Sequence, residues 1–154
     1  MDLSDLLNVE AIIPAMRVTG KKAALQKLCE RAAVDTSLDA RAIFDAVMER
    51  EKLGSTGVGY GVAIPHARLE GLDKVSGWFT RLDSAVDYDA VDDEPVDMMF
   101  LLLAPDAANA EHLKALARVS RFFRRENQRN RLREADSAAA MYALLTESKD
   151  RNAA

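Results

Sequence analysis

The most chemically suggestive feature of the sequence is a histidine that follows a glycine-rich segment. Residues 51–72 hold five of the seven glycines, and Gly57, Gly59 and Gly61 precede an apolar-Pro-His step that ends at His66. Glycines free backbone N–H groups to converge on an anion. A neutral imidazole keeps one lone-pair nitrogen while its other nitrogen donates its proton. The combination predicts an anion cradle around a nucleophilic nitrogen that can accept a phosphoryl group.

Hydroxyl and guanidinium groups lie close to this histidine in the sequence. Ser55 and Thr56 add hydroxyl donors, and Arg50 and Arg68 can supply positive charge for phosphate oxygens. The proline before the histidine should set the direction in which the imidazole leaves the end of a strand. A structural interpretation stays open, because a lone histidine near glycines is more often a hydrogen-bonding framework residue than a nucleophile.

Other motifs with glycines or a nucleophile do not fit this segment. A Walker A loop ends in Gly-Lys-Ser/Thr and enters a helix, whereas Gly61 is followed by Val62 and an expected strand. A dinucleotide fingerprint needs a third glycine where this chain has Val62 or Ile64. A serine-hydrolase elbow needs glycine two residues on each side of the serine, but Leu53 stands on one side of Ser55. We therefore expect no nucleotide and no other cofactor.

No metal site is indicated either. The two histidines and the single cysteine are far apart and have no zinc-ligand spacing. The acidic segment 83–95 has no glycine at the bend that an EF-hand requires, so it is interpreted as a solvated loop.

Composition and charge indicate one globular domain. The chain has 154 residues, 49% of them hydrophobic and 30% charged, with a formal net charge of −4, which argues against nucleic-acid binding. The longest apolar run, residues 98–104, is too short to cross a membrane, and the N-terminus lacks a secretion-signal pattern. The single cysteine is compatible with a reducing compartment. We expect a cytoplasmic protein without membrane insertion.

Apolar residues three or four apart predict four helices around this segment. One opens after an N-cap at Thr19, and the others cover residues 39–52, 109–124 and 137–146. The expected inward faces are Ala24, Leu25, Leu28, Cys29 and Ala32 in the first helix, Ala42, Ile43, Ala46 and Val47 in the second, and Leu113, Leu116, Ala117, Ser120 and Phe123 in the third.

Three strands are expected between these helices. They cover residues 61–64, which end at a proline, 75–81, and 96–103, the last apolar enough to be a central strand covered on both faces. Helices and strands alternate without a long linker, which predicts a single α/β domain over residues 1–154. The polar residues from about 148 to 154 are expected to fray.

The segment from Met48 to Arg68, MEREKLGSTGVGYGVAIPHAR, closely resembles the active-site segment of phosphotransferase-system IIA domains of the fructose/mannitol type. Within that group it looks most like the stand-alone nitrogen-regulatory branch. Two further stretches agree with the family, VDYDAVDDEPVDMMFLLLAP at residues 86–105 and EHLKALARVSRFF at residues 111–123. The resemblance covers nearly the whole chain, and the first motif is highly specific.

This resemblance implies a mixed β-sheet flanked by helices on both faces. It implies that His66 is phosphorylated on Nε2 by a small HPr-like phosphocarrier and that His112 is a supporting, non-phosphorylated histidine. Arg50, Ser55 and Thr56 would then lie in the neighbourhood of the phosphate.

The resemblance also implies a function through a phosphohistidine intermediate with mainly regulatory output. Phosphorylation of His66 would control target proteins, with transporters, sensor kinases and alarmone enzymes as possible targets. No IIB or IIC transport module occurs in the sequence, which favours regulation. The alternative is the IIA component of a fructose/mannitol-type sugar permease that passes phosphate to a separate IIB protein. A third reading, an interaction module that no longer turns over phosphate, is disfavoured by the intact set of Arg50, Ser55, Thr56 and His66.

Overall fold

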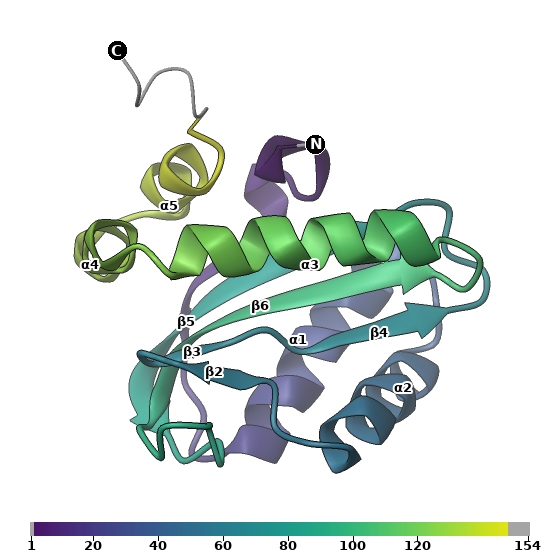
Figure 1. Cartoon of the computed structure of the whole chain (residues 1–154), viewed down its shortest axis with the longest axis horizontal. Helices are drawn as coiled ribbons and strands as arrows, with labels where there is room; N and C mark the ends of the chain where they lie inside the picture. The colour runs from purple at the N-terminus through teal and green to yellow at the C-terminus, as the bar shows by residue number, and fades with distance from the viewer. Residues whose placement is uncertain (1, 148–154) are drawn as a thin grey trace.

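A mixed six-stranded β-sheet forms the centre of the structure, a computed structural model that describes residues 2–147 (Figure 1). The strands are β1 (Ile12–Met16), β2 (Gly57–Gly59), β3 (Val62–Ala63), β4 (His66–Leu69), β5 (Ser76–Val86) and β6 (Val96–Pro105). The helices are α1 (Lys21–Thr36), α2 (Ala40–Lys52), α3 (Asn109–Phe123), α4 (Glu126–Glu134) and α5 (Ala138–Leu145), preceded by two 3₁₀ turns, η1 (Leu3–Asp5) and η2 (Val9–Ala11). The tail expected to fray, residues 148–154, lies outside the described residues.

The long antiparallel pair β5 and β6 organises the sheet, whose order is β1-β5-β6-β3-β2. On the far side of β6, both β3 and β4 pair with it in parallel, one after the other, and β2 turns back antiparallel to β3. The break between β3 and β4 falls at Pro65, which has no N–H to donate, although its carbonyl still accepts from the N–H of Leu102 at 2.9 Å. This hydrogen bond continues the pairing with β6 across the proline. His66 therefore begins β4 in register with Leu102 of the buried central strand.

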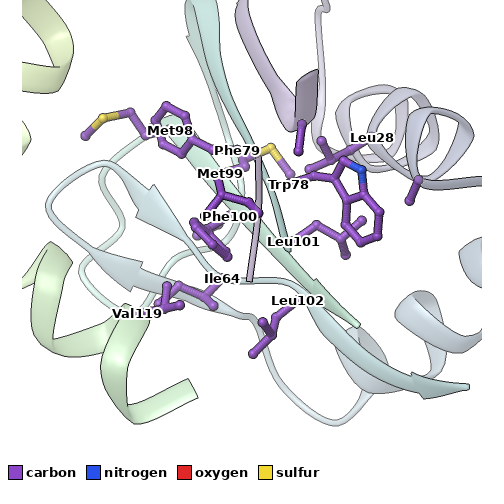
Figure 2. Close-up of a cluster of buried hydrophobic side chains, with 14 of the residues drawn as sticks. Leu28, Ile64, Trp78, Phe79, Met98, Met99, Phe100, Leu101, Leu102 and Val119 are labelled. Carbon is purple, nitrogen blue, oxygen red and sulfur yellow. The ribbon is translucent and has the colours of Figure 1, made fainter. Parts of the chain in front are cut away.

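Helices cover both faces of the sheet, as the family resemblance implies. On one face Trp78 donates through Nε1 to Asp35 of α1 at 2.8 Å, and Trp78 is paired in register with Leu101. On the other face Phe79 and Phe100 pack against Phe123 of α3, with ring centroids 6.0 and 6.3 Å apart. Figure 2 shows the two layers, with Leu28 beside Trp78 and with Val119 beside Ile64. Successive side chains of a strand point to opposite faces, so β5 and β6 supply both layers.

The helices expected from apolar spacing are present, with corrections to their details. The N-cap of α1 is Gly20, without a side-chain capping bond, and not Thr19. Asp39 caps α2 by accepting from the N–H of Ala42 at 3.1 Å, so Ala42 lies at the exposed first turn and not inward. The fourth helix begins after Ser137 as expected.

The expected core face of α3 is only partly correct. Its buried residues are His112, Ala115, Val119 and Phe123, whereas Leu113 is 67% exposed. Of the expected face, Ala117 is exposed and only Phe123 is fully buried. The helix carries apolar residues on two adjacent stripes that share Phe123. Phe123 packs against Phe79 and Phe100 of the sheet, and the stripe buried with it contains Ala115 and Val119. Leu113 is therefore left on the surface beside the histidines.

The strand boundaries also differ from expectation. The glycine segment is not a simple loop, because it forms β2, and the strand expected at 61–64 is shorter and resumes as β4 after the proline. The expected acidic connection begins later, since β5 continues to Val86.

Two elements, β1 and α4, could not be expected from local pattern. β1 contains Pro14, and α4 is almost entirely polar in sequence. Tertiary contacts stabilise α4, because Arg81 donates through Nη1 to the carbonyls of Leu132 and Arg133, each at 3.0 Å. No helix within residues 2–147 is long and apolar enough to span a membrane.

Candidate functional site

His66 and His112 lie together in an open depression formed by α2, β4 and the first two turns of α3. Their ring centroids are 5.5 Å apart and the rings meet edge to face, at an interplanar angle of 68°. The depression has a volume of about 720 Å³ and is also lined by Arg50, Arg68 and Leu113. The fold therefore brings together two histidines that are far apart in the sequence.

The hydrogen bonds of His66 fix which ring nitrogen carries the proton. Nδ1 lies 2.9 Å from the carbonyl oxygen of Ile64, which can only accept, so Nδ1 is the protonated nitrogen. Nε2 accepts a hydrogen bond from Nε of Arg50 at 3.2 Å, which requires a lone pair on Nε2. The two contacts agree on one tautomer, with the lone pair on Nε2 at the depression.

Arg50 is held at the end of α2 by a second bond. Its Nη1 donates to the carbonyl oxygen of Gly54 at 2.9 Å, just after the helix terminates. Gly54 has a φ of 153°, a backbone conformation that favours glycine, so the turn that presents this carbonyl depends on that residue. The guanidinium is thus fixed between the glycine segment and the imidazole.

His112 lines the same depression and has an unsatisfied ring nitrogen. The side chain is buried, and its Nε2 is the one buried side-chain nitrogen or oxygen without a hydrogen-bond partner among residues 2–147. Buried polar atoms normally have a partner, so this nitrogen is an exception within the described residues.

Both histidines are held in the neutral form by their surroundings. Burial lowers the pKa of His66 below 6.5, and the nearby Arg50 charge lowers it further, against the opposing effects of the Ile64 carbonyl and of Glu51. Burial also lowers the pKa of His112, and repulsion from the Arg68 charge and from the neighbouring imidazole of His66, if that ring were protonated, acts in the same direction. Neutral imidazole is the nucleophilic form, so the electrostatics of the site keep the Nε2 lone pair available at neutral pH.

The structure does not place Ser55 and Thr56 in the lining of the depression. The Ser55 hydroxyl donates to the carbonyl oxygen of Tyr88 at 3.1 Å and accepts from the N–H of Gly57 at the same distance. Thr56 is 4% exposed, and its hydroxyl donates to the carboxylate of Glu51. Both hydroxyls are engaged within the protein, behind the glycine segment.

Thr56 belongs to a buried polar cluster with Lys21, Glu51 and Tyr88. The sequence did not predict a role for these last three residues. Glu51 is buried in spite of its charge, and Lys21 lies 2.9 Å from its carboxylate. Tyr88 is completely buried although it belongs to the acidic segment interpreted as a solvated loop. The one signal in the sequence was Tyr88 itself, the only aromatic residue in the segment 83–95.

Arg68 reaches the site from β4. Its guanidinium donates to the side-chain oxygen of Asn109, the first residue of α3, and so joins the two elements that carry the histidines. Arg68 lines the depression, and its role toward phosphate oxygens stays a prediction.

A neutral imidazole with a fixed tautomer, a guanidinium on its lone-pair nitrogen and an open depression in front are the features of a phosphoryl-accepting domain. The chain belongs to the EIIA 2 family of the phosphoenolpyruvate-dependent sugar phosphotransferase system, whose pattern it matches over residues 5–148. Members of this family work with a phosphocarrier and with IIB-type partner proteins.

The relatives of the chain include both regulatory and sugar-specific proteins. The nitrogen regulatory protein of Bradyrhizobium diazoefficiens is 50% identical over 145 residues, which cover 94% of this chain and 95% of that protein. The fructose-specific EIIA component of Haloferax volcanii is 35% identical over 147 residues, 95% of this chain and 96% of that protein.

The solved structures give the same picture of the fold. The crystal structure of nitrogen regulatory protein IIA-Ntr from Neisseria meningitidis superimposes with a TM-score of 0.89 at 36% identity, covering 94% of this chain and 99% of that one. These comparisons confirm the family, its nitrogen-regulatory branch and the mixed sheet that the family resemblance implied.

Proposed function

We propose that His66 accepts a phosphoryl group on Nε2 from a small HPr-like phosphocarrier and that the phosphorylation state of the protein regulates other proteins. The observation that carries the proposal is the pair of bonds that fixes the imidazole. Nδ1 donates to Ile64 at 2.9 Å, so the lone pair of Nε2 faces Arg50 and the depression. The nitrogen-regulatory relatives support the regulatory part of the proposal.

The transfer is a displacement at phosphorus. The lone pair of His66 Nε2 forms a bond to the phosphorus carried by a nitrogen of the donor protein, and the electron pair of the breaking N–P bond returns to that donor nitrogen. The proton on Nδ1 stays in place, and the Ile64 carbonyl stabilises the positive charge that develops on the ring. No proton has to be removed from the nucleophile.

Arg50 and His112 have separate roles in this proposal. Arg50 releases Nε2 as the new bond forms, and its guanidinium is then placed to donate to the phosphoryl oxygens, while its bond to Gly54 keeps it at the site. His112, whose Nε2 has no partner within the described residues, donates to a phosphoryl oxygen when that nitrogen is protonated. Ser55 and Thr56 act through the glycine segment that they anchor.

Exposed leucines beside the depression fit the docking of the carrier. Leu53, just after α2, is 84% exposed, and Leu113 in α3 is 67% exposed, and both line the depression that contains His66. Large apolar side chains in such positions mark protein interaction sites. A carrier that covers them would also shield the transferring group from water.

Phosphorylation would change this surface strongly enough to switch interactions. A phosphate adds about two negative charges at neutral pH, in a depression that Arg50 and Arg68 both line. We place the protein in the cytoplasm, and we propose transporters, sensor kinases or alarmone enzymes as the classes of target.

Reconstitution tests the central step. The protein is mixed with phosphoenolpyruvate, enzyme I and the phosphocarrier, and the intact mass is followed for an acid-labile gain of one phosphate. We expect the unmodified chain to gain it and His66→Ala to gain none. Labelling of His66→Ala at the wild-type rate would contradict the proposal.

The fructose-specific relative favours one alternative, the IIA component of a sugar permease that passes phosphate to a separate IIB protein. A pull-down that compares the unphosphorylated protein with the reconstituted phosphorylated protein separates the two functions. Recovery of regulatory targets in one state supports regulation, whereas recovery of a sugar-specific IIB protein alone would support the permease.

A further inference from the structure

A buried carboxylate, Glu51, lies directly after Arg50 in α2 and has no part in the proposed transfer. Its side chain is 3% exposed, and Lys21 donates to Oε2 from 2.9 Å. The N–H of Thr56 donates to Oε2 at 3.2 Å, and the Tyr88 hydroxyl donates to Oε1 at 3.2 Å, beside the Thr56 hydroxyl. Burial of an ion pair is costly unless its remaining hydrogen bonds are made, and here they are.

A continuous set of hydrogen bonds leads from this carboxylate to the imidazole. Glu51 holds Thr56, and the carbonyl oxygen of Thr56 accepts from the N–H of Ile64 at 2.9 Å. The carbonyl oxygen of Ile64 accepts from Nδ1 of His66 at 2.9 Å. The other ring nitrogen, Nε2, accepts from Nε of Arg50 at 3.2 Å, and Arg50 is the covalent neighbour of Glu51. The bonds and the end of α2 therefore form a closed ring.

We propose that Glu51 is a positioning residue for His66, acting through Thr56 and Ile64 to hold the imidazole with its proton on Nδ1 and its lone pair on Nε2. The inference rests on the proposed function in that His66 is taken as the phosphoryl acceptor. It assigns to the Lys21–Glu51–Thr56–Tyr88 cluster a role in the reaction, although none of the four residues lines the depression.

The local chemistry explains why Ile64 needs this anchor. The amide that follows Ile64 belongs to Pro65 and has no N–H, so it cannot be tied to a neighbouring strand through a donor. The direction of the Ile64 carbonyl depends on the bond of its own N–H to Thr56 and on the Pro65 carbonyl. Thr56, for its part, is fixed only if the acceptor that faces its N–H and hydroxyl stays in place.

The other two members of the cluster keep Glu51 in place. Burial, together with the charge of Glu51, raises the pKa of Tyr88 far above its ordinary value, so its hydroxyl stays protonated as a donor. Lys21 also donates to the carbonyl oxygen of Tyr88 at 3.2 Å and lies 4.3 Å from the centre of its ring. The cluster thereby joins α1, α2, the glycine segment and the acidic segment behind the histidine.

The tautomer of His66 in the unphosphorylated protein is the direct test. Glu51→Gln keeps the shape of the side chain but removes its charge and replaces an acceptor oxygen by an NH₂ group that cannot accept from Thr56. Long-range ¹H–¹⁵N correlations of the imidazole report which nitrogen is protonated. We expect the wild type to carry the proton on Nδ1 and Glu51→Gln to show a measurable fraction with the proton on Nε2.

Kinetics supply the second readout. We expect Glu51→Gln to slow phosphorylation at saturating carrier by about 10- to 100-fold, the scale associated with a misplaced reacting group, while its affinity for the carrier is unchanged. Asp45→Asn is the matched control, because it neutralises an exposed carboxylate of the same helix whose side chain is 60% exposed. This control should match the wild type in both readouts.

A milder variant covers the case in which Glu51→Gln does not fold. Tyr88→Phe removes one donor from the carboxylate and keeps the buried ring, so it should shift both readouts in the same direction by a smaller amount. Wild-type tautomer and wild-type rate in a folded Glu51→Gln, or in Tyr88→Phe if that is the only folded variant, would overturn the inference. Failure of the wild type to accept phosphate would overturn the proposed function instead. The tautomer measurement would still test whether Glu51 positions the His66 imidazole.

Discussion

Nε of Arg50 lies 3.2 Å from Nε2 of His66, and Nη1 of the same guanidinium lies 2.9 Å from the carbonyl oxygen of Gly54. The end of α2 thus presents a fixed positive charge to the lone pair that the proposed reaction uses. Because the planar guanidinium reaches two acceptors at once, a lysine cannot reproduce the arrangement.

Replacement of Arg50 should therefore slow the transfer without unfolding the protein. We expect Arg50→Ala to reduce the rate of phosphate gain by about 100-fold or more, as for the loss of one donor to a developing charge. Arg50→Lys should recover part of the rate, because it keeps the charge but not the double contact. Rapid-quench mass spectrometry at saturating carrier measures both variants, and equal rates for Arg50→Ala and the wild type would exclude the role.

His112 should accelerate the transfer without being required for it. A hydrogen bond to a charged group contributes about 1.5–3 kcal/mol, so His112→Ala should accept phosphate about 10- to 100-fold more slowly. His112→Gln can place an amide N–H near the former Nε2 and should retain more of the rate. Complete loss of labelling in a folded His112→Ala protein would show that this histidine is more than a supporting residue.

The exposed leucine of α3 should contribute to carrier binding. We expect Leu113→Asp to weaken the affinity for the carrier by about 10-fold, or 1.4 kcal/mol, as measured by isothermal titration calorimetry. Its free energy of unfolding should change by less than about 0.5 kcal/mol because the side chain is exposed. Val34→Asp is the control, since Val34 is 77% exposed on α1 and does not line the depression. If both variants bind the carrier equally well, Leu113 lies outside the interface.

The lowered pKa values of the histidines predict a pH dependence of stability. The unfolded chain protonates its histidines as the pH falls through about 6.5, whereas His66 and His112 in the folded protein resist protonation until a lower pH. The unfolded state then binds more protons, so the free energy of unfolding should fall as the pH decreases between those values and should not depend on these groups above them. Urea unfolding across this range measures the slope.

The matched variant for this measurement is the double substitution His66→Gln and His112→Gln, which should lose the histidine component of the slope. An NMR titration in which either folded histidine protonates above 6.5 would contradict the prediction.

Gly57 should be intolerant of a side chain. A Cβ at this position would lie 2.7 Å from Cβ and 2.9 Å from the backbone Cα of Ala90. We expect Gly57→Ala to lower the free energy of unfolding by about 1–3 kcal/mol, the usual cost of overpacking. Gly20→Ala, where no atom lies within 4 Å of the added Cβ, should cost about 1 kcal/mol or less as a weakened N-cap. Similar losses in a denaturant titration would show that Ala90 can move aside.

Much of the fold could be predicted from the sequence where local pattern and tertiary packing agree. The helices expected at residues 39–52 and 137–146 are present, with Asp39 and Ser137 as their N-caps, and the apolar strand Val96–Pro105 is the buried centre of the sheet. The polar helix α4 could not be predicted, because bonds from the distant Arg81 to its last carbonyls help to stabilise it. The inward face of α3 was ambiguous for a similar reason, since only packing against the sheet selects between its two apolar stripes.

The sequence by itself determined which segment carries the candidate site, because glycine spacing, the proline and the histidine after it are local properties of one short segment. It was sufficient to identify the family and to select His66. Only the tertiary structure decided how His66 is oriented, since its two ring nitrogens meet groups from the strand end and from a different helix. Tertiary structure also decided that the hydroxyls of Ser55 and Thr56 bond within the protein and do not line the depression. It buried Glu51 and left Leu113 exposed. Burial and hydrogen bonding depend on which segments meet in space, and residue types along the chain do not fix that.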